Sequence, residues 1–192
     1  MQAQPLLNHI TPYVTLIESE KEQIGKYFSH HTYKKKDILM RGGTTCKHNF
    51  FIVKGCAHMY YINDKGIERT VQFALENWWI TDNLAYLRQS KTDFFIQTTE
   101  DTELLAISFD QQETMLAAIP SLEKYFRLMY QIGYGAAMNK LRWLSDLSKE
   151  EIYLQFLEQY PEFAQRVPQY LIASFLGLTP EYVSEIRAKL RS

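Results

Sequence analysis

The C-terminal stretch Gln169–Lys189 narrows the possible folds more than any other part of the sequence. It reads QYLIASFLGLTPEYVSEIRAK, which is two short amphipathic segments separated by a glycine. Gly177 follows the last apolar turn of the first segment, where a helix end favours a left-handed residue. Thr179 is a good helix N-cap and Pro180 a good first helical residue. The stretch therefore predicts two helices joined by a tight glycine turn.

The apolar residues of this stretch fix how the two helices face each other. Ile172 and Leu176 share one face of the first helix, and Ala173 offers a small side chain where the second helix can cross. Val183 and Ile186 form the buried side of the second helix. A small residue, a glycine turn and a capped second helix hold the two helices of a helix-turn-helix at a steep angle. We therefore predict a helix-turn-helix; the alternative is an αα-corner in another kind of helical domain.

The second helix carries the residues that would read DNA. Such a helix enters the major groove with its N-terminal turns against the base edges. The start of the helix suits a phosphate, and Glu181 can accept a hydrogen bond from cytosine N4. Glu185 puts a negative charge on the same side, which works against tight binding. The basic residues at the end suit phosphates, and also suit the helix dipole as solvated side chains. The predicted DNA contacts are Thr179, Pro180, Glu181, Tyr182, Ser184, Glu185, Arg187, Lys189 and Arg191.

The composition sets limits on this hypothesis. Phosphate neutralisation by Lys and Arg supplies most of the non-specific affinity of a protein for DNA. Because the net charge is −1, any DNA binding depends on a local cluster of residues rather than on the charge of the whole chain. Two cysteines, Cys46 and Cys56, are too few for a disulfide framework. No apolar run has the length of a membrane span, and the first residues do not read as a signal peptide. We therefore expect a cytoplasmic protein without membrane partners.

Residues 33–108 have the sequence pattern of a small β-domain. Short runs rich in β-branched and aromatic residues alternate with turn signals, of which Arg41–Gly43 and Asn63–Gly66 are the clearest. This pattern is typical of a small barrel or roll. The residues before it look helical, with Ile17, Ile24 and Phe28 at helical spacing. The predicted strands are Asp37–Met40, Asn49–Val53, His58–Ile62, Thr70–Phe73, Phe94–Thr98 and Glu103–Ile107.

A long helix follows the β-domain. Its apolar residues alternate by four and three, the spacing of a helix that pairs with another helix. We predict that it forms a homodimer; the alternative is that the stripe packs on the chain's own roll. Ser148 can cap the next helix, with Glu151 completing a capping box. The predicted domains are 1–120, 121–147 and 148–192, and the predicted dimer interface is Leu122, Phe126, Met129, Gly133 and Ala136.

Together these features resemble the Crp/Fnr superfamily of bacterial regulators. The resemblance rests on LGLTPEYVSEIRAKL and on the middle stretch HNFFIVKGCAHMYYINDKGIERTVQFALENWWITDN, with its Lys54–Gly55 turn. It implies an α+β protein with an N-terminal antiparallel, cyclic-nucleotide-binding-like β-roll, a dimerisation helix and a C-terminal helix-turn-helix. It also implies a homodimer, an effector pocket in the roll, binding to a palindromic promoter and RNA polymerase as a further partner. No β-hairpin wing is evident after the recognition helix.

The sequence departs from this family in its effector site. Members that bind cyclic nucleotides carry a Glu for the ribose and an Arg, followed by Ser or Thr, for the phosphate. Here Asp82 stands near the carboxylate position, but Phe94 and Phe95 occupy the region of the Arg, and a buried phosphate without a guanidinium is costly. Arg88 and Lys91 are the nearby replacements. We therefore expect no cyclic nucleotide, and Cys46 with Cys56 cannot supply an iron–sulfur cluster. The candidate effector pocket is Trp78, Trp79, Asp82, Arg88 and Phe95.

Other classes of function fit the residues less well. A cupin-like enzyme needs a His-x-His pair and a Glu on neighbouring strands, whereas His30 and His31 are adjacent and would point to opposite faces of a strand. No metal site and no catalytic set is predicted. For Trp78–Trp79, the alternative to a pocket is one side chain in the core and one at its rim. A further alternative is a ligand-binding or scaffold dimer without DNA output.

Overall fold

The computed structural model describes residues 3–191, and its side chains are described up to Lys189. The chain forms two compact units. Unit 1 comprises the residues up to Tyr61 together with Gln72–Tyr130, and unit 2 comprises Ile62–Val71 together with the residues from Gln131 onward. The predicted contact Arg191 has its side chain outside the described part. The units differ from the predicted domains because one hairpin tip and the second half of the long helix belong to unit 2.

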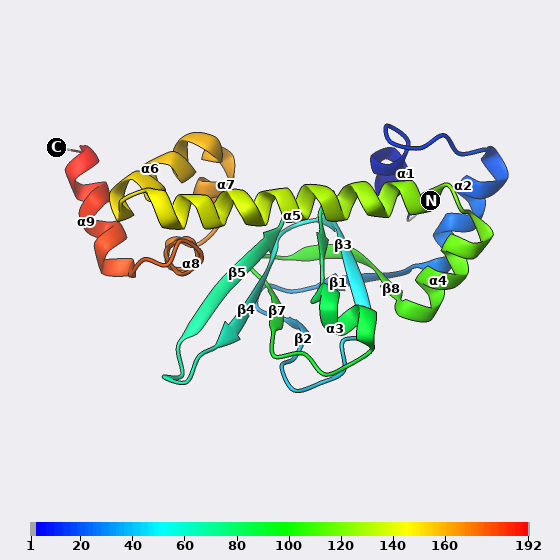
Figure 1. The fold of residues 1–192 in the computed structure, drawn as a ribbon, viewed down its shortest axis with the longest axis horizontal. Coiled ribbons are helices and arrows are strands. Elements are labelled where there is room, and N and C mark those ends of the chain that lie inside the picture. Colours follow the sequence, from blue (N-terminus) through cyan, green and yellow to red (C-terminus); the bar gives the residue numbers. More distant parts are fainter. Residues whose placement is uncertain (1–2, 192) are drawn as a thin grey trace. The chain divides into compact units, whose positions relative to one another are not determined.

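The β-roll consists of two four-stranded antiparallel sheets (Figure 1). The strand orders are β1-β8-β3-β6 and β2-β7-β4-β5. All six predicted strands are confirmed within two residues, whereas β1 and β6 were not predicted. The strands are β1 Ser29–Tyr33, β2 Ile38–Met40, β3 His48–Lys54, β4 Ala57–Ile62, β5 Glu68–Ala74, β6 Trp79–Ile80, β7 Phe95–Thr98 and β8 Thr102–Ser108.

The turn between β3 and β4 requires a glycine. Gly55 has a φ of 101°, and a Cβ there would lie 2.7 Å from the carbonyl oxygen of Asp101 and 2.6 Å from the hydroxyl of Thr102. A side chain at this position would therefore be strained and would collide with the neighbouring turn. The backbone N–H of Gly55 donates to Glu76 at 2.7 Å. The predicted Lys54–Gly55 turn is thus fixed both by sterics and by a hydrogen bond.

Helices flank the sheets in unit 1, and helices make up most of unit 2. The prediction of a helical N-terminus is confirmed in part, because Ile17 precedes α2 and Phe28 follows the short 3₁₀ segment Gly25–Tyr27. None of the described helices combines the length and apolar composition that a bilayer crossing requires. The helices are α1 Gln4–Ile10, α2 Glu18–Ile24, α3 Asn83–Arg88, α4 Phe109–Ala118, α5 Leu122–Asp146, α6 Lys149–Gln159, α7 Pro161–Arg166, α8 Gln169–Phe175 and α9 Pro180–Arg191.

The core of unit 1 lies between one sheet and the helices. Phe51, Leu105 and Ile107 from β3 and β8 pack with apolar residues of α1, α4 and α5. In the same core, Trp79 Nε1 donates to the Tyr125 hydroxyl at 2.8 Å, and His9 Nδ1 lies 2.8 Å from that oxygen. The Tyr125 hydroxyl donates to Nδ1 in the His9 tautomer that carries its proton on Nε2, and accepts from Nδ1 in the other. Burial lowers the pKa of His9, which agrees with a neutral ring.

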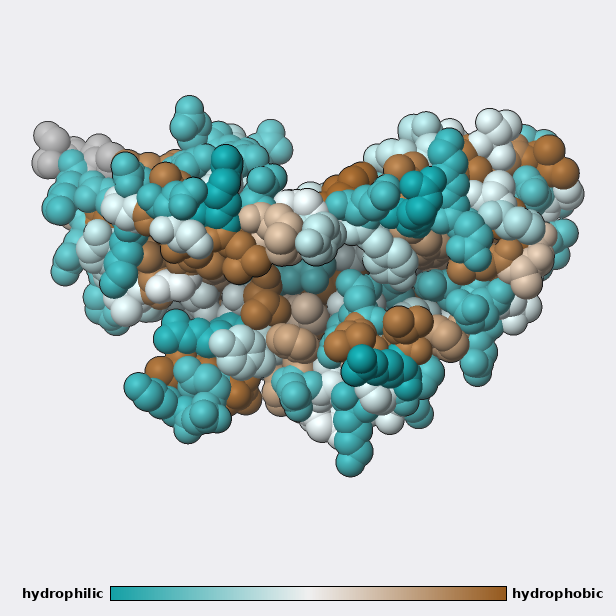
Figure 2. Space-filling view, viewed as in Figure 1, coloured by the Kyte–Doolittle hydropathy of each residue, from teal (hydrophilic) through white to brown (hydrophobic). Residues whose placement is uncertain are grey.

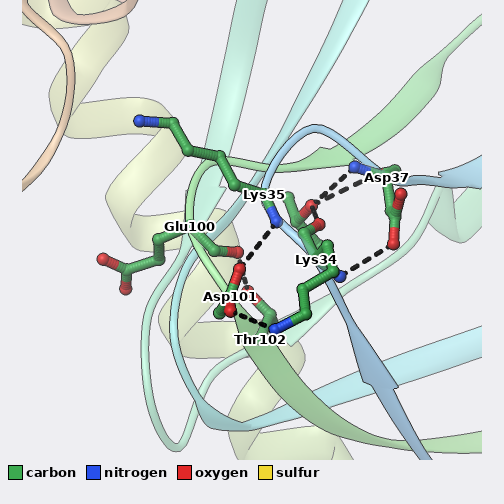
Figure 3. A network of polar contacts seen from close by, with 7 residues as sticks. Lys34, Lys35, Asp37, Glu100, Asp101 and Thr102 are labelled. Atoms are coloured by element: carbon green, nitrogen blue, oxygen red, sulfur yellow. Dashed lines mark hydrogen bonds and ion pairs between the residues drawn. The ribbon is translucent and has the colours of Figure 1, made fainter.

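A polar network joins the β1–β2 turn to the β7–β8 turn (Figure 3). The Lys34 ammonium lies 2.7 Å from Asp101, whose other oxygen accepts from the backbone N–H of Lys35 at 3.0 Å. The backbone N–H of Lys34 donates to Asp37 at 2.7 Å. These groups are exposed, so the ion pair adds little stability. The run Lys34–Lys36 is therefore a solvated turn with one exposed ion pair, between Lys34 and Asp101.

Candidate functional site

The two helices predicted as a helix-turn-helix are present, as α8 and α9. α8 begins at Gln169 as predicted, and Gly177 after it has a φ of 70°. The N–H of Leu178 donates to the carbonyl of Ala173 at 2.9 Å, and the N–H of Gly177 donates to that of Ser174 at 3.2 Å. These two bonds form a complete Schellman motif, which satisfies the carbonyls at the end of a helix. The turn geometry therefore follows from the glycine.

The start and the buried side of α9 also follow the prediction. The N–H of Tyr182 donates to the Thr179 hydroxyl oxygen at 3.2 Å, which caps the helix. Val183 and Ile186 are buried, at 0% and 1% exposure. Leu178 is buried in the corner between the helices. α9 is thus held by its apolar side, and its other side is left to solvent.

The exposed side of α9 is mixed in charge. Glu181 and Glu185 are exposed and lie one turn apart, on the side away from Val183 and Ile186. Arg187 and Lys189 are exposed further along the helix. Among the other predicted contacts, Thr179 uses its hydroxyl as the cap, the Ser184 hydroxyl donates to the Pro180 carbonyl at 2.9 Å, and Tyr182 is half-buried. The exposed first turns therefore present two carboxylates, with cations only in later turns.

Within unit 2, strand β5 of the β4–β5 hairpin is hydrogen-bonded to α8. The N–H of Thr70 donates to the Ser174 hydroxyl oxygen at 2.9 Å, and that hydroxyl donates to the carbonyl of Glu68 at 3.1 Å. Lys140 of α5 places its ammonium 3.4 Å from the carbonyl of Val71 and 3.5 Å from the centre of the Phe175 ring. The first helix of the pair is therefore bound directly to a hairpin that continues from the roll strands. The Ser174 hydrogen bonds join residues 104 and 106 positions apart, and the Lys140–Val71 contact joins residues 69 apart, so no local sequence pattern predicts them.

Burial gives Lys140 an unusual titration. It lowers the pKa from 10.5 to about 8. Between these values the unfolded chain holds a proton that the folded chain has lost, so the folded state gains stability as the pH rises through that window. We expect Lys140→Met to be more stable than the natural protein at pH 7, with an advantage that shrinks by about 2–3 kcal/mol by pH 10.5. Urea unfolding at several pH values measures this difference. Arg142→Met is the control, since it removes an exposed basic side chain of the same helix, and a pH-independent advantage for Lys140→Met would contradict the assignment.

The long helix α5 runs almost as predicted, but part of the predicted dimer interface is wrong. Leu122 and Phe126 are buried at 0% and 4% exposure in the chain's own unit 1 core, and Met129 packs against that core. Leu122 and Phe126 are therefore not available to a second copy, whereas Met129 is only partly buried. Gly133 and Ala136 are exposed, and a Cβ on Gly133 would meet nothing within 4 Å. Their role in a dimer stays a prediction.

A second apolar stripe on α5 is exposed. Tyr134, Leu141 and Leu144 are 68%, 55% and 43% exposed, and Ala137 lies between them. The spacing 134–137–141–144 is the three-and-four alternation of a helix seam. It is shifted by one residue from the predicted register, which turns the face by about 100° around the helix. Figure 2 shows apolar, brown side chains at the surface in the region around the C-terminal half of α5. We call Tyr134, Ala137, Leu141 and Leu144 the exposed seam.

The structure places the five residues predicted to line an effector pocket in different surroundings. Trp79 is partly buried and packs on Phe51 and Phe126 at the edge of the unit 1 core as well as bonding to Tyr125, and its role in a pocket stays a prediction. Trp78 is 50% exposed. Arg88 is exposed in the last turn of α3, and Phe95 stacks on Tyr60 with ring centres 5.2 Å apart. One tryptophan in the core and one at the surface was the alternative interpretation.

Comparison with known proteins places these units in a familiar fold. The family model described as the cyclic nucleotide-binding domain matches residues 30–118. FixK2 from Bradyrhizobium japonicum has a TM-score of 0.73 at 16% identity, with 85% of this chain and 84% of that chain covered. The chain has the Crp/Fnr fold. A protein of the crp/fnr family from Eubacterium rectale gives a TM-score of 0.70 at 16% identity, covering 92% and 84%. A variant of CooA from Carboxydothermus hydrogenoformans gives 0.70 at 20%, covering 88% and 78%. No protein of curated function matches this chain significantly in sequence.

The Crp/Fnr fold raises the question of a cyclic nucleotide, and the residues present do not fit one. Both carboxylate oxygens of Asp82 are already used: one accepts from the N–H of Ala85 at 3.1 Å, the other from the Thr92 hydroxyl at 2.7 Å. Thr92 is buried, and its oxygen also accepts from the N–H of Phe94 at 3.0 Å. The segment thus closes on itself around a carboxylate, which would repel a phosphate. Arg88 and Lys91 are exposed and take no part in this closure.

Proposed function

We propose that this chain is a sequence-specific DNA-binding transcriptional regulator that acts as a homodimer in the cytoplasm. The observation that carries the proposal is the α8–α9 pair, in which a Schellman turn and an N-cap hold a second helix with its first turns exposed. That arrangement suits insertion of α9 into the major groove. A palindromic duplex is the proposed target, and RNA polymerase is a further proposed partner. The roll serves as a sensor for a small effector, or as a scaffold, without a cyclic nucleotide or an iron–sulfur cluster.

Catalysis is not part of the proposal. No group of three metal-ligating side chains occurs among the described residues. His30 and His31 do not converge: His30 lies 3.8 Å from Glu103, and His31 lies 2.9 Å from the Ser29 hydroxyl. A dimer without DNA output is the second candidate, because Glu181 and Glu185 make the exposed first turns of α9 acidic. The two candidates differ in whether duplex DNA binds at all.

Anisotropy of a labelled duplex tests the DNA proposal. The natural protein should bind with an affinity that falls as salt rises, because bound cations on DNA are released. Arg187→Ala should weaken binding to all sequences by a similar factor and reduce the salt slope by about one ion per subunit. Lys26→Ala removes the same charge from unit 1 and should leave binding unchanged. If duplex binding is absent at low salt, or if both variants behave alike, the second candidate is favoured.

Calorimetry tests the proposal on cyclic nucleotides. We expect no low-micromolar binding of cyclic AMP, because Asp82 and Thr92 close the site and no buried guanidinium pairs with the phosphate. Asp82→Asn/Thr92→Arg should introduce measurable binding, since it removes the carboxylate charge and adds a cation. Low-micromolar binding to the natural protein would overturn this proposal and would implicate Arg88 or Lys91, to be tested by Arg88→Ala and Lys91→Ala.

A further inference from the structure

Unit 1 contains a pocket that the predicted effector residues do not touch. Its volume is about 510 Å³, within the range of small-molecule sites. It lies between β2, the loop that follows it and the start of β3, and this loop forms the lower edge of the roll in Figure 1. Met40 and Phe50 give it an apolar wall, and Arg41, Lys47 and His48 give it a basic one. We call it the basic pocket.

The ionisable residues that line the basic pocket are all basic. No aspartate or glutamate lines it. Among the described residues, Arg41, Lys47 and His48 form no ion pair. The pKa of His48 is lowered by its burial and further by the positive charges of His31 and Lys47. Arg41 and Lys47, two cations without a lining carboxylate beside them, create a positive potential that attracts anions.

The pocket is also pre-formed. Its loop is hydrogen-bonded along the segment 90–92: Gly43 donates to the carbonyl of Thr92 at 2.7 Å, and Cys46 donates to that of Ser90 at 3.0 Å. Gly42 lies so close to β7 that a Cβ would sit 2.7 Å from the Phe95 ring. A loop held in this way loses little conformational freedom when a ligand binds. The basic side chains are therefore carried by a loop whose backbone is already ordered before a ligand binds.

From these observations we infer that the basic pocket binds a small organic anion. The carboxylate or phosphate of the ligand pairs with Arg41 and Lys47, the neutral His48 ring lies beside it as a hydrogen-bond partner, and the apolar part of the ligand covers Met40 and Phe50. Arg41 is suited to this role because its planar fork binds either anion in a bidentate manner. The site gives the sensor roll an effector class that the cyclic-nucleotide segment does not accept. It concerns unit 1 alone and does not rest on DNA binding.

Calorimetry with phenyl phosphate, without DNA, tests the inference on the full chain. Phenyl phosphate should bind, and benzyl alcohol, which has the ring without the charge, should bind at least tenfold more weakly. Arg41→Ala/Lys47→Ala should weaken phenyl phosphate binding by about tenfold or more, since two charge-assisted contacts are lost. Lys26→Ala/Lys54→Ala changes the net charge equally outside the pocket and should bind as the natural protein does. Arg41 and Lys47, the two residues substituted, are exposed, and an unchanged thermal midpoint shows that the variants fold.

Each other result would overturn the inference. Absence of phenyl phosphate binding at ten millimolar rejects the ligand class. Equal binding of benzyl alcohol shows that the cations contribute nothing. Equal weakening in both double variants shows that only the net charge matters, and unchanged binding in Arg41→Ala/Lys47→Ala places the ligand elsewhere. Because DNA is absent from every arm, these results are independent of the proposed function.

Discussion

Leu141→Glu should convert the protein from a dimer to a monomer at micromolar concentration. Leu141 lies in the middle of the exposed seam and is 55% exposed in the single chain. In a two-fold symmetric pair the same surface of both subunits forms the interface, so one substitution changes the interface at two places. Burying a carboxylate without a partner costs several kcal/mol, and each 1.4 kcal/mol is about a tenfold change in the dissociation constant. We therefore expect dissociation to be favoured by at least about a hundredfold.

Sedimentation velocity over a range of concentrations measures this effect. Leu87→Glu is the matched control, because Leu87 is an exposed leucine of α3, 65% accessible, outside the seam. It should leave the dimer intact. A natural protein that is monomeric at a hundred micromolar would contradict the homodimer, and a dimer that survives Leu141→Glu would show that the interface uses another surface.

Glu185→Arg should raise the affinity for generic duplex DNA by about tenfold or more at low salt. The exposed Glu185 lies on the side of α9 opposite its buried residues, so it faces the groove if α9 enters it. The substitution removes a repulsive charge and adds a phosphate or guanine partner. The dependence of affinity on salt should steepen by about one to two ions per subunit.

Anisotropy titrations at several salt concentrations measure both quantities. Glu123→Arg makes the same charge change on the part of α5 that belongs to unit 1, and it should change neither the affinity nor the slope appreciably. If Glu185→Arg and Glu123→Arg have equal effects, the gain comes from net charge and α9 does not face the DNA.

The sequence predicted best those features that depend on neighbouring residues. Gly177, Thr179 and Pro180 define a turn and a cap by local backbone geometry, and Ser148 with Glu151 forms the predicted capping box, with the Ser148 N–H donating to Glu151 at 2.8 Å. β1 was missed because its residues, SHHTY, lack an apolar alternation, and its burial pattern shows only half-buried and exposed residues. A strand of that kind is defined by its pairing with β8 rather than by its own composition.

Long-range packing set the limits of the prediction. α5 carries two apolar stripes, one residue out of register, and the sequence does not tell which of them packs on the chain itself. The stripe with Leu122 and Phe126 packs inward because α1, α4 and the sheet supply the rest of its core. Trp79 likewise packs against that core. The hydrogen bonds of Ser174 to β5 join residues whose local sequences contain no signal for a contact. The same holds for the residues that line the basic pocket.

Selection from a random duplex library tests the central claim most directly. With the natural full chain as bait, the account predicts enrichment of a palindrome whose two half-sites lie about one helical turn, or about 10 base pairs, apart. Glu181→Ala should relax the base preference at one position in each half-site and leave their spacing unchanged. A library that stays unenriched after repeated rounds, together with unchanged duplex binding by Glu185→Arg, would show that α8 and α9 are a helical corner and not a reader of DNA.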